Sequence, residues 1–82
     1  MKVTDYICTV IIKHPETLHN LRAIVDAVDN NKMEGFEIDR GRINRWAYIE
    51  DAHKYFKIIL LSDGTFLNAY PDGRYTQQKR KE

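Results

Sequence analysis

The pair Asp63-Gly64 constrains the fold of this 82-residue chain more than any other feature, because strand-forming residues lie on both sides of it. Residues 54–62 and 65–70 are rich in isoleucine, leucine, phenylalanine and tyrosine. Asp and Gly both tolerate the positive φ angles of a type I′ turn, and the twist of that turn matches the strands that it joins. We therefore predict a β-hairpin with a two-residue turn here, and we place the rest of the chain around it.

Two further strands are predicted before the hairpin. In residues 34–39 apolar and acidic side chains alternate, which is the period of a strand with one buried face. In residues 42–49 a similar alternation places Trp46 and Tyr48 on the face opposite to Ile49. An Arg-Gly pair between the two runs can reverse the chain, so the four strands are predicted to form one antiparallel meander.

The N-terminal third is predicted to form one strand and one helix. The run Tyr6–Ile12 within residues 3–13 is apolar and rich in β-branched side chains, which favours a central strand. Pro15 suits the first position of a helix, and apolar residues then recur every three or four positions as far as Val28. Asn31 suits the end of this helix, because asparagine tolerates the left-handed conformation there. We expect the helix to bury Leu18, Leu21, Val25 and Val28 against Phe56, Ile58, Leu60 and Phe66.

These elements together predict an α+β fold of order β-α-β-β-β-β, in which one helix packs on one face of a mainly antiparallel sheet. The chain is long enough for one domain, which we assign to residues 1–76. Residues 77–82 are polar and basic, and we expect this tail to be frayed. One helix cannot cover both faces of such a sheet, so several aromatic side chains would lie on an uncovered face.

The sequence predicts a cytoplasmic protein without a membrane partner. Cys8 is the only cysteine, so no disulfide can form within the chain, which fits a reducing compartment. No apolar run approaches the roughly 18 residues that span a bilayer. The residues after Met1 do not form the apolar core of a secretory signal, since Asp5 interrupts them.

No motif in the chain predicts catalysis, a metal or a cofactor. His14 and His19 are five positions apart, so they do not share one helical face as a metal-binding pair would. His53 lies in a predicted turn without a second histidine near it. Neither a nucleophile signature nor a phosphate-binding glycine loop is present. We therefore assign no catalytic residue, no metal ligand and no cofactor.

Charge is segregated along the chain, although the net charge is only +1. Residues 16–39 carry six acidic and two basic side chains, whereas residues 40–57 carry five basic and two acidic ones. Such polarity bears on partners rather than on the fold. It defines two candidate partner-binding surfaces: an acidic helix face of Glu16, Asp26 and Asp29, and a basic-aromatic strand of Arg40, Arg42, Arg45, Trp46 and Tyr48.

The first functional hypothesis is a small non-catalytic binding protein. Tryptophan, tyrosine and arginine are enriched in interface hot spots, and an uncovered sheet face marks an interaction site. Such a protein would act as a regulator or inhibitor by docking on a larger, nucleic-acid-processing complex. The comparison with the small proteins that phages and mobile elements encode is an analogy from size and style. Self-association as a homodimer through the uncovered face or a free edge is a further option.

Two other hypotheses use the same residues. A nucleic-acid-binding regulator would use the basic-aromatic strand together with the basic tail, because arginine binds phosphates and aromatic rings stack on bases. Lys57, Tyr70 and Arg74 are candidates for the same basic-aromatic sheet face. The low net charge and the lack of the common RNA-binding sheet motif weigh against it. Alternatively, the arginines pair with acidic residues on adjacent strands and Trp46 belongs to the core. A small enzyme is the third hypothesis.

Overall fold

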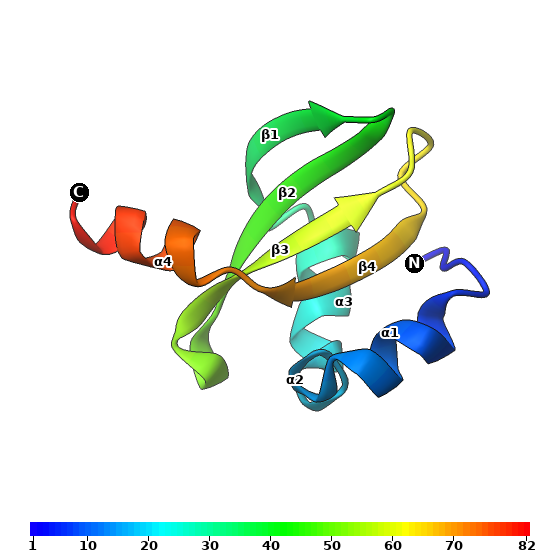
Figure 1. Cartoon of the computed structure of the whole chain (residues 1–82), viewed down its shortest axis with the longest axis horizontal. Helices are drawn as coiled ribbons and strands as arrows, with labels where there is room; N and C mark the ends of the chain where they lie inside the picture. Colours follow the sequence, from blue (N-terminus) through cyan, green and yellow to red (C-terminus); the bar gives the residue numbers. More distant parts are fainter.

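The computed structural model describes residues 1–82, and it is an α+β fold in which helices precede and follow one antiparallel sheet (Figure 1). In the sequence, the sheet lies between an N-terminal group of three helices and a single C-terminal helix. None of the helices has the length and apolar character needed to cross a bilayer. The elements are α1 (Ile7–Lys13), α2 (Pro15–His19), α3 (Leu21–Asp29), β1 (Glu34–Asp39), β2 (Arg42–Ile49), the 3-10 helix η1 (Glu50–Ala52), β3 (Lys54–Leu60), β4 (Phe66–Pro71) and α4 (Gly73–Arg80).

The predicted four-strand antiparallel meander is confirmed, with the strand order β1-β2-β3-β4. The central pair, β2 and β3, is regular, and its register runs without interruption from Ile43 opposite Leu60 to Ile49 opposite Lys54. The two outer pairs each contain an irregularity. Because alternation along β2 and β3 is unbroken, the two faces of the sheet are well defined in its centre.

The two-residue turn lies at the β1–β2 hairpin, not at the β3–β4 hairpin where we predicted it. Arg40 and Gly41 both have positive φ angles, of 56° and 78°, and they are flanked by the paired residues Asp39 and Arg42. Positive φ at both central positions is the requirement of a type I′ turn. Arg40 adopts this conformation although it is not glycine, because the twist of a type I′ turn matches the twist of the adjoining strands.

The β3–β4 hairpin has a longer loop, so the prediction of a type I′ turn at Asp63-Gly64 is wrong. Only Gly64 has a positive φ, of 89°, and its N–H donates to the carbonyl oxygen of Leu61 at 2.9 Å. The N–H of Leu61 donates to the Thr65 carbonyl oxygen at 2.8 Å, which closes a three-residue loop. The Asp63 carboxylate accepts the N–H of Thr65 at 2.9 Å, and this local bond favours the wider loop.

The predicted N-terminal strand is wrong, because residues 7–13 form α1. Of that strand only one parallel bridge exists, between Val3 and Phe66. The carbonyl oxygen of Thr4 accepts the N–H of Ile7 at 3.1 Å, and this turn starts the helix. Strand propensity depends on the context in which a side chain packs, and in α1 Val10 is fully buried.

The single predicted helix is two helices, α2 and α3, which meet at Asn20. The side-chain amide of this buried asparagine donates to the carbonyl oxygen of Glu16 at 2.8 Å, and such competition with the backbone bends a helix. The bend changes which side chains face the sheet. Ile24 and Ala27 are buried, whereas Leu18 is 53% exposed, in contrast to our prediction.

The predicted end of the helical segment is confirmed. Asn31 has a φ of 51°, in the left-handed region. The N–H of Lys32 donates to the Ala27 carbonyl oxygen at 2.8 Å, and the N–H of Asn31 donates to that of Val28 at 3.4 Å. These two bonds form a Schellman motif, which directs the chain from α3 into β1.

The main core lies between α3 and one face of the sheet. Phe56, Ile58 and Phe66 are fully buried, as predicted, and they contact the same apolar cluster as Ile24 and Ala27. Each large side chain buried in this way contributes about 1.5–3 kcal/mol to folding. In Figure 1 α3 passes behind the sheet, so the face toward the viewer is the one that α3 does not cover.

The sequence did not predict α4. Asp72, expected to lie in a turn, caps this helix, because its carboxylate accepts the N–H of Tyr75 at 3.0 Å. The Thr76 hydroxyl accepts the N–H of Tyr55 at 2.8 Å, which attaches the helix to β3. The tail that we expected to be frayed is therefore helical as far as Arg80. The helix lies beyond the strand ends that are remote from α1 (Figure 1).

Candidate functional site

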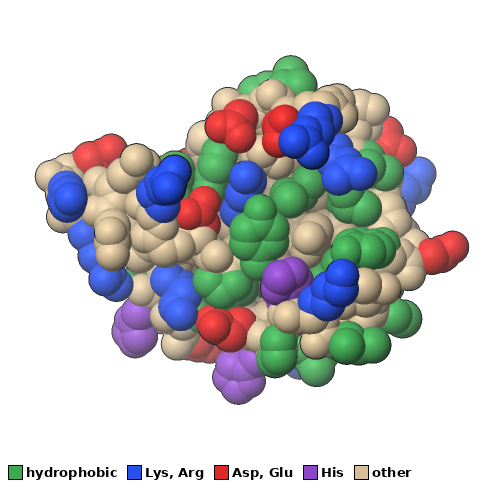
Figure 2. Space-filling model, viewed as in Figure 1, with side chains coloured by type: hydrophobic (Ala, Val, Ile, Leu, Met, Phe, Trp, Pro, Cys, Tyr) green, Lys and Arg blue, Asp and Glu red, His purple; other side chains and the backbone are tan.

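The face of the sheet opposite to α3 is the principal candidate site, and we call it the open face. The register across the sheet places Trp46, Lys57 and Tyr70 in one row of this face. A neighbouring row contains Ile59 and Asn68. Figure 2 shows this side of the molecule, where hydrophobic and basic side chains are interleaved over the strands.

Trp46 lies beneath α4 and is only 8% exposed. Its ring stacks on that of Tyr75, with the centroids 4.7 Å apart and the planes 7° apart. Its indole N–H donates to Oδ2 of Asp72 at 3.0 Å. Trp46 is therefore the centre of a second, small core that attaches α4 to the sheet.

Gly35 allows β1 to cross the Trp46 ring. A Cβ atom at this position would lie 2.7 Å from Cε3 of Trp46, which is closer than real contacts allow. The φ of Gly35 is also +71°, a conformation that side chains other than glycine rarely adopt. Both requirements select glycine at the irregular point of the β1–β2 pairing.

Charged groups complete the attachment of α4. Burial would raise the pKa of Asp72, but hydrogen bonds from the Trp46 indole and the Tyr75 N–H outweigh burial and lower it. Burial likewise opposes ionisation of Glu34, yet Lys79 at 3.0 Å and the Tyr75 hydroxyl at 2.8 Å lower its pKa. Burial, followed by the nearby Glu34 carboxylate, raises the pKa of Tyr75 to about 12. We call the group of Trp46 and Glu34 on the sheet and Asp72, Tyr75 and Lys79 at or within α4 the α4 anchor.

The basic-aromatic strand does not form one surface. Arg40 lies at the tip of the β1–β2 hairpin with an ion pair to Asp39 at 3.8 Å. Arg45 lies on the α3 side of the sheet and donates to the carbonyl oxygens of Met33, at 3.0 Å, and Gly35. Trp46 is buried, as described above. Of the five residues, Arg42 and Tyr48 are the ones that the register places exposed on the open-face side.

The acidic helix face is paired with cations at each of its three carboxylates. Glu16 lies 3.2 Å from Nζ of Lys54, and Asp29 lies 3.4 Å from the N-terminal ammonium group. Asp26 pairs with Lys32 at 2.8 Å, and the hydrogen bond from this lysine is the main cause of its lowered pKa. These carboxylates thus present less free negative charge than the sequence suggested.

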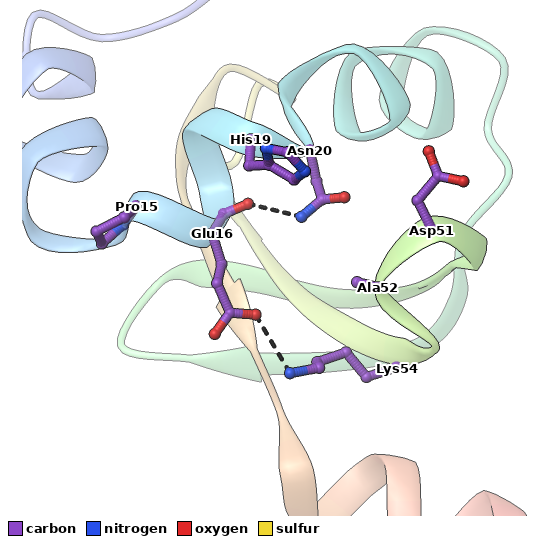
Figure 3. A pocket seen from close by; sticks show the side chains of 7 residues that line it. All are labelled: Pro15, Glu16, His19, Asn20, Asp51, Ala52 and Lys54. Atoms are coloured by element: carbon purple, nitrogen blue, oxygen red, sulfur yellow. Dashed lines mark hydrogen bonds and ion pairs between the residues drawn. The ribbon is translucent and has the colours of Figure 1, made fainter.

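A shallow hollow of about 430 Å³ lies beside Glu16, between α2 and η1 (Figure 3). The pair of Glu16 and Lys54 bridges α2 to β3 on one side of it, and Asp51 stands on the other. The hollow is lined mostly by polar side chains. No three His, Cys, Asp or Glu side chains in the protein converge as metal ligands would. We assign no chemistry to this hollow.

Sequence reasoning missed His14 on the open face, whereas it grouped Lys57, Tyr70 and Arg74 with the basic-aromatic strand. Lys57 and Tyr70 are neighbours across β3 and β4, and the His14 ring lies 5.5 Å from that of Tyr70. Arg74, at the start of α4, lines the same hollow of about 350 Å³ as Lys57. Lys57 shares a face with Trp46 because alternation along β3 is regular. His14 reaches this face only through the tertiary fold.

The cations of the open face are not neutralised by ion pairs. Arg42, Lys57 and Arg74 take part in none of the ion pairs of the protein. Three carboxylates lie near these cations without a direct ion pair to them, because Asp39 is opposite Arg42 in the strand register and Glu37 and Asp72 line the same hollow as Lys57 and Arg74. Glu37 accepts from the Asn44 amide at 2.9 Å, and Asp72 accepts from the Trp46 indole. The face therefore offers unpaired basic groups beside an aromatic ring, an arrangement that can bind an anion carrying planar groups.

No protein-family model matches the chain, and neither a curated protein nor a solved structure shows significant similarity to it. No function can therefore be transferred from a relative. The chemistry of the open face has to be inferred from its own residues.

Proposed function

We propose that this protein is a non-catalytic binding module that regulates a nucleic-acid-processing complex and holds single-stranded nucleic acid on its open face. The observation that carries this proposal is the group of unpaired cations, Arg42, Lys57 and Arg74, on the same side of the sheet as Tyr70. Guanidinium and ammonium groups bind phosphates, and a tyrosine ring stacks on any base.

The shape of the face favours a single strand over a duplex. The face contains two hollows, and each includes a residue of β3. One, of about 310 Å³, is lined by Arg42, Ile59 and Asn68 among others, and the other contains Lys57. Tyr70 is half-buried and its ring is supported by His14, so it presents a preformed stacking surface. Unstacked bases can enter shallow hollows and stack on such rings, whereas bases in a duplex are already stacked.

The first test is the salt dependence of oligonucleotide binding. Fluorescence anisotropy with a labelled RNA or DNA strand of about 12 nucleotides, within the span of one small binding domain, should show an affinity that decreases with salt. Three phosphate contacts correspond to a slope of about −2 for log K against log salt concentration. A matched duplex should bind more weakly. A flat salt response, or stronger binding of the duplex, would contradict the proposal.

Charge-matched variants separate the open face from net charge. The triple variant Arg42→Gln, Lys57→Gln and Arg74→Gln should lose about tenfold or more in affinity, and the salt slope should approach zero. The control triple variant Lys2→Gln, Arg22→Gln and Lys81→Gln removes the same formal charge from exposed residues that also make no ion pair. Equal losses in both variants would show a general charge effect and would refute the site.

The same binding samples test whether the module is non-catalytic. After incubation with the protein, a labelled strand analysed on a denaturing gel should keep its full length. A shortened strand would contradict the non-catalytic part of the proposal. His14, whose ring contacts Tyr70 on this face, would then be the first residue to substitute.

A further inference from the structure

The outer strand β1 exposes two large apolar side chains on the α3 side of the sheet, beyond the cover of α3. Phe36 is 64% exposed and Ile38 is 67% exposed. On the other side of the same strand, Glu37 and Asp39 are exposed carboxylates. Adjacent exposed apolar residues on an edge strand favour pairing with another strand, and most proteins avoid them.

The two edges of the sheet differ in this respect. At the β4 edge the N-terminal segment is hydrogen-bonded to the strand, because Phe66 donates to the Lys2 carbonyl oxygen at 2.8 Å and accepts the Thr4 N–H at 3.2 Å. The Thr17 hydroxyl also donates to the carbonyl oxygen of Ala69 on β4. No element of the chain pairs with the outer edge of β1, which is the first strand of the sheet.

We propose that the β1 edge binds an extended segment of a partner protein in which apolar residues alternate with lysine or arginine. Such a segment would add a fifth strand and gain main-chain hydrogen bonds along β1. Its apolar residues would cover Phe36 and Ile38. Its basic residues would then face Glu37 and Asp39, since neighbouring side chains of a strand point to opposite faces.

Charge decides between this partner and a second copy of the chain. In a two-fold antiparallel pairing of β1 centred on Glu37, each Glu37 lies opposite the Glu37 of the other copy. Like charges directly opposite one another destabilise a strand pair. Apart from Glu34, which is paired with Lys79, the strand contains the acidic residues Glu37 and Asp39 and no basic residue, so no shift in register brings opposite charges together. A segment with alternating basic residues is complementary to it in every register that places its apolar residues over Phe36 and Ile38.

Arg45 prepares this edge for binding. Its guanidinium group donates to the carbonyl oxygens of Met33, at 3.0 Å, and Gly35, which holds the beginning of β1 in place. The same group lies 6.0 Å from the centroid of the Phe36 ring. A ring that is already held by its neighbours loses less entropy on binding, and aromatic residues of this kind act as interface hot spots.

The test uses a synthetic seven-residue peptide, Lys-Val-Lys-Ile-Lys-Val-Lys, and a control peptide with glutamate in place of each lysine. Amide chemical shifts of the full-length, ¹⁵N-labelled protein should change at residues 34–39 with the basic peptide only. Equal binding of the acidic peptide, shifts confined to another surface, or no binding would overturn the proposal. A dimer whose interface includes residues 34–39, detected by sedimentation, would do so too.

Matched variants connect the binding to β1. The variant Phe36→Ser/Ile38→Ser should weaken peptide binding by about fivefold or more, because two exposed hot-spot side chains are lost. Ile12→Ser/Leu18→Ser removes apolar side chains that are 78% and 53% exposed on α1 and α2, and it should leave binding unchanged. Peptide binding should also persist in the Arg42, Lys57 and Arg74 triple variant. Failure at β1 is therefore distinct from failure of the open-face proposal.

Discussion

The two faces of the sheet are built by different interactions. On the α3 face, apolar side chains such as Phe56 and Ile58 are fully buried in a continuous cluster. On the open face only one end is covered, and α4 is held there by a stacked ring pair, a helix cap and ion pairs. Hydrophobic burial is non-directional and does not depend on ionisation, whereas the α4 anchor depends on both direction and charge. The remainder of the open face is not covered by α4 (Figure 1).

The largest effect is expected on the α3 face. Phe56→Ala should lower the free energy of unfolding by about 3–5 kcal/mol, because it removes a fully buried ring and leaves a cavity. Urea denaturation followed by circular dichroism measures this change. Ile12→Ala is the control at an exposed apolar position and should change stability by less than about 0.5 kcal/mol. Similar losses in both variants would show that the core is elsewhere.

A smaller effect is expected at the α4 anchor. Asp72→Ala removes the cap of α4 and leaves the Trp46 indole without its acceptor, which should cost about 2–3 kcal/mol. Trp46 fluorescence should shift to the red as α4 detaches. Hydrogen exchange of the β3 amides between β2 and β4 should remain slow. Global loss of protection would show that the two faces are not separable.

Two glycine variants refine the geometry of the anchor. Gly35→Ala should cost about 1–3 kcal/mol, because it combines a positive φ with a clash against the Trp46 ring. Gly41→Ala has a similar φ, of +78°, but a Cβ atom there would meet no other atom within 4 Å, so it should cost about 1 kcal/mol. Thermal unfolding of the pair measures the difference. Equal costs would mean that the ring contact contributes nothing.

The smallest effect is the response of the anchor to pH. The pKa values of Glu34 and Asp72 are lowered in the folded protein, so their contribution to stability is complete above their ordinary values of 4.5 and 3.8. It is lost as pH falls below those values. The pKa of Tyr75 is raised from 10.0 to about 12, so its contribution is lost as pH rises through that interval. Trp46 fluorescence should change in both ranges, and Glu34→Gln should reduce the acid response.

Local patterns were sufficient for the centre of the sheet. Strict alternation along β2 and β3 predicted both faces, and the burial of Phe56 and Ile58 follows from it. The Schellman motif at Asn31 was also predictable, because the left-handed conformation depends on a single residue. These features depend on neighbours in the sequence, which is why they could be inferred without the fold.

Local patterns failed to predict the secondary structure of segments that are stabilised by long-range contacts. The β-branched residues of α1 favour a strand, but burial of Val10 favours the helix. The eight residues of α4 include one aromatic and no apolar stripe, so no periodicity reveals a helix there. The role of Tyr75 follows from the stacking of its ring on Trp46, which is far from it in the sequence.

The sequence by itself determined the meander, the alternation of its faces and the end of α3. Each of these follows from propensities and periods within a few residues. The tertiary structure alone decided that Trp46 is buried, that His14 lies beside Tyr70 on the open face, and that β1 keeps a free edge. Burial and charge pairing depend on which elements pack together, and packing joins residues that no local pattern connects.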